Sequence, residues 1–171
     1  MNLDNSNRAR AKLLIFAFPG IHLRKLQKLL NVSFTTTRYH VENLERDSEI
    51  VCSKDGRYHR LYPAGTNDRM KEVYSVLQGK NNGRVLRALA NDDEHALTNG
   101  DLSEMLHLPR STISECANAL ARVDLAERSL TLDGRILYRI GDLELVEAAR
   151  GLLERNPLNT ARDNFLDLWD I

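Results

Sequence analysis

The chain has 171 residues, of which 42% are hydrophobic and 28% are charged, a balance typical of folded soluble proteins. This composition excludes disordered, collagen-like and membrane-embedded proteins. The 24 Lys and Arg residues equal the 24 Asp and Glu residues, so the net charge alone indicates no nucleic-acid partner. Cys52 and Cys116 are too few for a disulfide framework or a thiolate zinc site, which is typical of a reducing cytoplasm.

The first expected element is a helix over Arg8–Phe18, which Pro19-Gly20 interrupts. Charged residues follow this break at once, so the stretch is not a signal peptide. A second helix follows, because apolar residues recur at helical spacing, at Leu23, Leu26, Leu29 and Leu30. No other run approaches the roughly 18 apolar residues that a spanning helix requires. We therefore expect a soluble, cytoplasmic protein with no membrane partner.

A third helix and a β-hairpin come next. Ser33 is a good N-cap, and the helix is expected to run to about Asp47 with Thr37, Val41 and Leu44 turned inward. Two strand-like runs, 50–53 and 58–62, are joined through Asp55-Gly56, which supplies the backbone conformation of a tight hairpin turn. Three helices followed by a hairpin is the order of a winged helix-turn-helix domain.

The same pattern occurs twice. A displacement of 76 positions aligns Leu26 with Leu102, Leu30 with Leu106, Thr36 with Thr112, Leu44 with Leu120 and Arg46 with Arg122. In the second copy a helix is expected over 84–91, Thr98 and Asp101 form a capping box, and Pro109 opens the third helix. Asp133-Gly134-Arg135 repeats Asp55-Gly56-Arg57 at the hairpin tip. The sequence predicts a mainly α protein with small β-hairpin wings and two tandem winged helix-turn-helix domains.

The expected divisions are a first winged helix domain at 1–66, a connecting helix (67–78) and linker (79–83), a second winged helix domain at 84–141, and a closing helix (142–155) and tail that together cover 142–171. The closing helix and tail carry apolar residues that favour a homodimer, Leu143, Val146, Leu152, Leu153, Phe165, Leu168 and Trp169. The alternative is that the tail folds back over its own core.

Several motifs resemble a known family. The segments 19–24, 37–41 and 56–58 read PGIHLR, TRYHV and GRY, and the chain resembles the archaeal tandem winged-helix transcriptional regulators over both halves. The segment 108–114 is similar to the recognition helix of many repressors. The resemblance implies an archaeal host, DNA binding and transcription control. Glu115 and Cys116 depart from it, since the first copy has Tyr39 and His40 there.

The third helix of the first copy is the expected DNA-reading element, because its N-terminal part enters the major groove in such motifs. Arg38 is the candidate for a bidentate contact to guanine. The wing supplies further groups able to meet phosphates. The expected contacts of this copy are Thr35, Thr36, Arg38, Tyr39 and Arg46 on the helix, and Lys54, Arg57, His59 and Arg60 on the wing.

Charge divides the chain unequally. Residues 1–62 hold 11 basic and 6 acidic residues, whereas the remainder holds 13 basic and 18 acidic residues. In the second copy the outward candidates are Arg110, Ser111, Ser114 and Arg122, and Glu115 is expected among them. A carboxylate there weakens attraction to phosphates. We therefore expect the first domain to dominate DNA contact.

Catalytic and metal chemistry find no support in the sequence. There is no phosphate-cradling glycine loop or nucleophile elbow, and no ligand spacing joins Cys52, His59, His40 and Cys116. His40 is expected to support the helix base. We expect a sequence-specific regulator of transcription that binds double-stranded DNA without a cofactor and is not an enzyme. The alternative is a protein-interaction module of the transcription or replication machinery.

Overall fold

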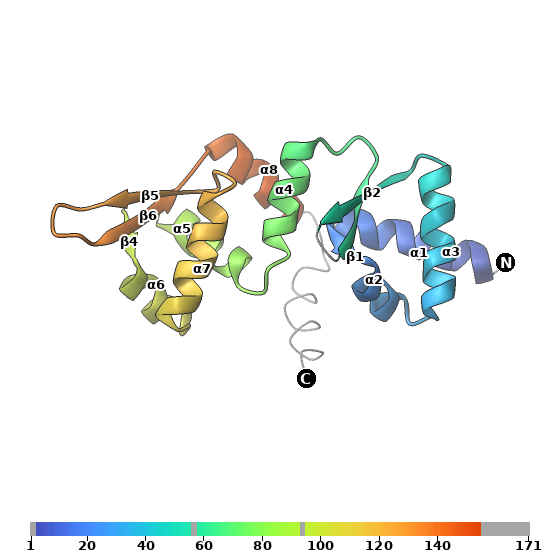
Figure 1. Ribbon diagram of the computed structural model, residues 1–171, viewed down its shortest axis with the longest axis horizontal. Helices are drawn as coiled ribbons and strands as arrows, with labels where there is room; N and C mark the ends of the chain where they lie inside the picture. The colour runs from blue at the N-terminus through green and yellow to red at the C-terminus, as the bar shows by residue number, and fades with distance from the viewer. Residues whose placement is uncertain (1–2, 56–57, 93–94, 155–171) are drawn as a thin grey trace. The chain divides into compact units, whose positions relative to one another are not determined.

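The computed structural model describes residues 3–55, 58–92 and 95–154 and divides the chain into two units, Met1–Ser75 and Val76–Ile171 (Figure 1). Each unit contains helices and a three-stranded antiparallel sheet. The fold is therefore mainly helical with two small sheets, as the sequence predicts.

The first unit is built around three helices and a hairpin. Its elements are α1 (Leu3–Ala17), β1 (Ile21–His22), α2 (Leu23–Leu30), α3 (Phe34–Arg46), β2 (Ile50–Asp55) and β3 (Tyr58–Pro63), followed by α4 (Asp68–Leu77), which crosses the boundary. The strand order is β1-β3-β2. The largest buried side chains of α1, α2 and α3 meet in one core that includes Ile15, Leu26 and Leu44.

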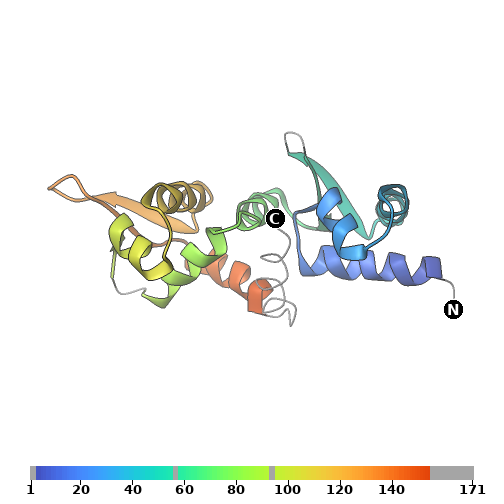
Figure 2. The same cartoon turned by 90° about the horizontal axis from the view of Figure 1, so that it is seen from below.

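The second unit repeats this order. Its elements are α5 (Asn82–Asn91), β4 (Leu97–Thr98), α6 (Asn99–Leu106), α7 (Arg110–Ala121), β5 (Ala126–Leu130), β6 (Ile136–Ile140) and α8 (Leu143–Glu154). The strand order is β4-β6-β5. The hairpin of β5 and β6 extends beyond the helices of its unit in both views (Figures 1 and 2).

The predicted repeat of 76 positions is present in the backbone. The bounds of β1 and α2 fall 76 residues before those of β4 and α6. Ser48 and Asp124, at the same displacement, follow α3 and α7 with φ of 56° and 55°. The repeat therefore extends to the turns as well as to the core positions.

Each sheet has one strand more than the sequence predicts. Ile21 and His22 pair with Leu61 and Arg60, so the residues after the Pro19-Gly20 break form an edge strand. The Pro19-Gly20 break holds Ile21 and His22 beside β3, because the N–H of Gly20 donates to the carbonyl of Leu61 at 2.8 Å. Gly20 has a φ of +81°, which a glycine adopts without strain.

The hairpin tips differ between the copies. Asp55 pairs with Tyr58, and the Gly56 and Arg57 between them lie outside the described residues. In the second copy the N–H of Thr131 donates to the carbonyl of Arg135, so this loop is one residue longer. Gly134 has a φ of +81°, as a three-residue hairpin loop with a glycine requires. The repeat of 76 positions places 131–133, and not the predicted 133–135, at the positions that correspond to 55–57.

Most remaining boundaries are close to the expected ones, but α1 begins at Leu3, five residues before the expected start at Arg8. The connecting helix is α4, and α5 begins at Asn82, inside the expected linker, where the Asn82 side chain donates to the carbonyl of Val76 at 2.6 Å. Pro109 is the N-cap of α7 and precedes its first helical residue. The closing helix is α8, and the tail 156–171 lies outside the described residues. Within the described parts, no helix is long and apolar enough to cross a membrane.

Candidate nucleic-acid interface

Helix α3 presents the outward face that the sequence predicts. Ser33 caps it by accepting a hydrogen bond from the N–H of Thr36 at 3.0 Å. The inward positions are buried at Thr37, His40, Val41 and Leu44, which fixes the rotation of the helix. The exposed side chains are Phe34, Thr35, Arg38, Tyr39, Glu42, Glu45 and Arg46. This face is the only side of α3 that a groove can meet.

Two of these exposed residues form an ion pair. Arg38 donates from Nε to Oε1 of Glu42 at 2.7 Å, and the two side chains are 66% and 58% exposed. Tyr39 is half exposed, and its ring meets that of His40 edge-on with 5.5 Å between the centroids. Sequence reasoning named Arg38 and Tyr39 but missed the ion pair of Arg38 with Glu42, which the spacing of four residues could have indicated.

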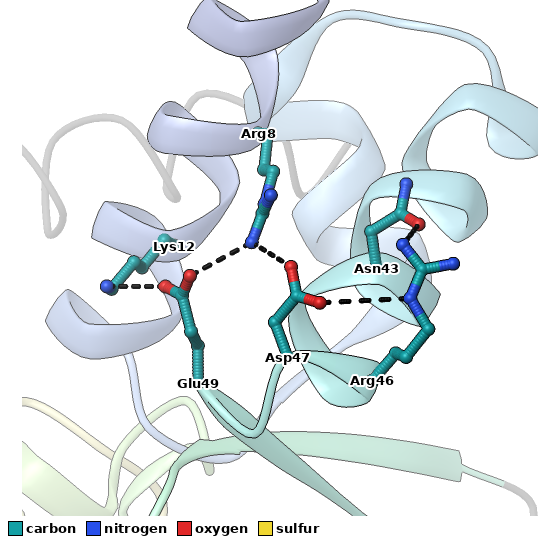
Figure 3. A network of polar contacts seen from close by, with 6 residues as sticks. All are labelled: Arg8, Lys12, Asn43, Arg46, Asp47 and Glu49. Atoms are coloured by element: carbon teal, nitrogen blue, oxygen red, sulfur yellow. Dashed lines mark hydrogen bonds and ion pairs between the residues drawn. The ribbon is translucent and has the colours of Figure 1, made fainter.

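A polar network joins α1 to the end of α3 (Figure 3). Arg8 pairs with Asp47 at 2.5 Å and with Glu49 at 2.9 Å, and Lys12 also pairs with Glu49. The hydrogen bond from Lys12 lowers the pKa of Glu49. Asp47 and Glu49 therefore neutralise two basic residues of α1 on the side of the unit where α1 meets the start of β2.

The same network engages Arg46, a predicted DNA contact. Its guanidinium donates to the side-chain oxygen of Asn43 at 2.7 Å and lies 3.7 Å from the carboxylate of Asp47. The side chain is 74% exposed. Arg46 is therefore accessible, but a phosphate has to compete with Asp47 for its charge.

The first wing brings together part of the predicted set. Lys54 and His59 are exposed and directly opposite each other on β2 and β3. His59 Nδ1 lies 3.7 Å from the sulfur of Cys52, whose pKa is raised by burial and by the charge of Glu45. Arg57 lies outside the described residues.

Arg60, the fourth basic or histidine residue predicted on the wing, has a different environment. It is half-buried, and its Nη1 donates to the carbonyl of Gly20 at 3.1 Å. This bond ties β3 to the turn before β1. Arg60 therefore supports the sheet, and Lys54 and His59 are the described wing groups that are exposed to a phosphate.

Helix α7 presents a different surface. Arg110, Ser111 and Arg122 are exposed, whereas Ser114 is half-buried and accepts a hydrogen bond from Asn99 at 2.6 Å. Glu115 is exposed, as expected. The pKa of the neighbouring Cys116 thiol is raised by burial and then by Glu115. Ser114 and Glu115 thus stand where α3 has Arg38 and Tyr39, whereas Arg122 keeps the cationic position of Arg46.

The tip of the second wing exposes two leucines, which sequence reasoning missed. Leu130 is 71% exposed and Leu132 is fully exposed. The loop is held by a hydrogen bond from Thr131 to Asp133 and by an ion pair of 2.9 Å between Arg135 and Asp133. Leu130 stands 76 positions after Lys54, so the repeat itself could have revealed this exchange.

The helices that precede α3 and α7 are capped differently. His22 accepts from the N–H of Lys25 through Nδ1 at 3.2 Å, and burial followed by the charge of Lys25 lowers its pKa. Thr98 and Asp101 form the predicted capping box, and hydrogen bonds from Thr98 lower the pKa of Asp101. Within the ranges that the structure describes, no group of three or more His, Cys, Asp or Glu residues is arranged to hold a metal ion.

One known domain family matches part of the second copy. Residues 83–129 match the IclR helix-turn-helix domain. The match runs from α5 into β5 and covers the helices α6 and α7. This part of the chain is therefore similar to an IclR helix-turn-helix domain, and the hairpin of β5 and β6 begins at the end of the matched residues. No curated protein matches the chain significantly.

Solved structures resemble parts of the chain. Reduced HlyU from Vibrio cholerae N16961 is 23% identical, with a TM-score of 0.42 over 51% of this chain and 86% of its own. The protein in the S. aureus MepR–DNA complex is 19% identical, with a TM-score of 0.41 over 58% of this chain and 87% of its own. A possible transcriptional regulator from Methanosarcina mazei Go1 is 16% identical, with a TM-score of 0.39 over 71% of this chain and 98% of its own. Similarity at this level does not assign a function.

Proposed function

We propose that the chain is a sequence-specific regulator of transcription that binds double-stranded DNA through its winged helix-turn-helix units. The observation that carries this proposal is the exposed face of α3, where Thr35, Arg38 and Tyr39 stand on a helix whose opposite face is buried. Hydroxyl, guanidinium and aromatic groups on such a helix are suited to base edges in the major groove. The helix-turn-helix family match over 83–129 supports the same function for the second unit.

The first unit dominates DNA contact in this proposal. Residues 1–62 carry an excess of basic residues, and Lys54 and His59 lie exposed on the wing beside α3. The second unit presents Glu115 on α7 and leucines on its wing. Since phosphate neutralisation supplies most of the affinity for any duplex, the cationic unit binds more tightly.

A salt titration of the full chain tests this function. Affinity for a duplex is expected to fall steeply as salt rises from about 50 to 200 mM. Lys54→Ala should weaken binding about equally on all sequences, whereas Arg38→Ala should relax preference at particular base pairs by roughly 1–3 kcal/mol. Glu72→Gln on α4 is the control, since Glu72 is exposed and pairs only locally with Arg69 among the described contacts. Affinity that is independent of salt would contradict the proposal.

The exposed leucines of the second wing favour a second candidate function, a protein-interaction module of the transcription or replication machinery. Leu130 and Leu132 lie on an ordered hairpin tip, and exposed apolar side chains of this kind contact proteins in many complexes. In this case Leu130→Ser would abolish capture of the partner protein, and the chain would not bind duplex DNA at any salt concentration.

We further propose a homodimer in an archaeal cytoplasm. Helix α1 exposes Leu13 and Phe16, and α8 exposes Leu143, so both carry apolar side chains that a second copy can cover. The two cysteines are free thiols, as is usual in a reducing compartment. Light scattering on the full chain and on Leu13→Ser tests the dimer, and a monomer in both would exclude it.

A further inference from the structure

The carboxylate of Glu42 is bonded to the arginine that the proposed function assigns to base reading. The bond of 2.7 Å joins Oε1 of Glu42 to Nε of Arg38, one helical turn away. Both side chains are more than half exposed, so the pair lies on the outer surface of α3. An exposed pair at this spacing contributes little to stability. Stability therefore does not explain a carboxylate on this face.

The carboxylate also opposes DNA binding. A negative charge on the surface that approaches a duplex repels phosphates and lowers affinity for every sequence. The second copy has Ser114 and Asn118 at the corresponding positions, 76 residues later, and neither is charged. The ion pair is therefore a feature of the first recognition helix alone.

The bond has a specific geometric effect on Arg38. Glu42 engages Nε, and this bond leaves the donors of Nη1 and Nη2 available. Guanine presents two acceptors, O6 and N7, to such a pair in the major groove. A guanidinium that is fixed in one orientation before binding loses less side-chain entropy when it meets the base.

We propose that Glu42 is the positioning residue that fixes Arg38 for bidentate contact to guanine, so that α3 discriminates in favour of a G·C base pair. This inference rests on the proposed function. Glu42 raises discrimination because it orients Arg38 for the correct base, whereas its charge lowers the affinity for all sequences alike. Its loss therefore raises affinity for random DNA and lowers discrimination.

The experiment uses the full chain and a duplex enriched by the wild type from a pool with a randomised centre. Each guanine of that duplex is replaced in turn by 7-deazaguanine, which keeps its base pairing but lacks the N7 acceptor. The wild type is expected to lose about 5–100-fold in affinity at one guanine. Glu42→Ala is expected to lose most of this penalty and to bind a scrambled duplex more tightly than the wild type.

Two matched variants separate the charge from the hydrogen bond. Glu45→Ala removes the same charge from an exposed position on α3, and no bond joins Glu45 to Arg38. It should raise affinity for the scrambled duplex and retain the full 7-deazaguanine penalty. Glu42→Gln keeps an oxygen that accepts from Nε and should retain part of the penalty. Because the pair is exposed, all three variants are expected to give the wild-type circular dichroism spectrum.

Three results would overturn the inference. If Glu42→Ala kept the full penalty, Glu42 would only repel DNA. If no guanine of the enriched duplex were sensitive, Arg38 would not read guanine N7, although the proposed function would stand. If the wild type bound no duplex at all, the proposed function would fail together with the inference.

Discussion

Asn31 and His107, the residues that end α2 and α6, adopt the same left-handed backbone conformation 76 positions apart. Their φ and ψ angles are 55° and 45° for Asn31, and 53° and 43° for His107. In both copies the backbone N–H of this residue donates to a carbonyl of the last helical turn. Glycine and asparagine tolerate this conformation better than other residues. The second copy therefore carries a small backbone strain that the first avoids.

His107→Gly is expected to stabilise the second unit by about 0.5–1 kcal/mol, because glycine adopts the left-handed conformation without strain. His107 is exposed, so the substitution leaves no cavity. Thermal unfolding should show an increase of about 2–8 °C in the transition of this unit. Asn31→Gly is the control and should have a smaller effect. A lower transition temperature for His107→Gly would contradict the argument.

The stability of the first unit is expected to fall in mildly acidic solution through His22. This side chain caps α2 as an acceptor, and burial holds its pKa below the ordinary value of 6.5. The fold thus favours the neutral imidazole. Its contribution to stability is complete above pH 6.5 and is lost as the pH falls through the lowered pKa.

His22→Thr tests this dependence, because Thr98 performs the same capping at the matching position of the second copy. Unfolding measured between about pH 7 and pH 5 should show a loss of stability in the wild type and a much smaller loss in the variant. The carboxylates with lowered pKa, such as Glu49 and Asp101, titrate at lower pH and do not obscure this range. Equal slopes for both proteins would exclude His22 as the cause.

Sequence periodicity predicts the helices and their exposed faces but not the partners of single side chains. The inward positions Thr37, Val41 and Leu44 followed from spacing alone, and the structure buries them. The bond from Arg60 to Gly20 joins residues 40 positions apart, so no local pattern could indicate it. The strands β1 and β4 could not be predicted either, because two residues are too few to show a strand pattern.

The network around Glu49 is expected to hold α1 against the junction of α3 and β2. Glu49→Gln removes the charge that Arg8 and Lys12 share. The midpoint of urea unfolding should decrease at low salt, and the difference from the wild type should shrink near 1 M salt, where charges are screened within about 3 Å. Glu72→Gln, which affects a local pair with Arg69 on α4, should change neither value. A difference that persists at high salt would indicate packing and not charge.

Reciprocal exchange at the two wing positions tests the unequal roles of the units in the full chain. Lys54 and Leu130 occupy corresponding places on β2 and β5, and both are exposed. If the first wing neutralises a phosphate, Lys54→Leu should reduce the slope of log affinity against log salt by about 1. Leu130→Lys should leave that slope unchanged, because in our proposal the second wing is not on the duplex. Both are surface changes and should preserve the fold. A slope that rises by about 1 in Leu130→Lys would show that the second wing also reaches the phosphates, and the two units would then bind DNA as a bivalent clamp.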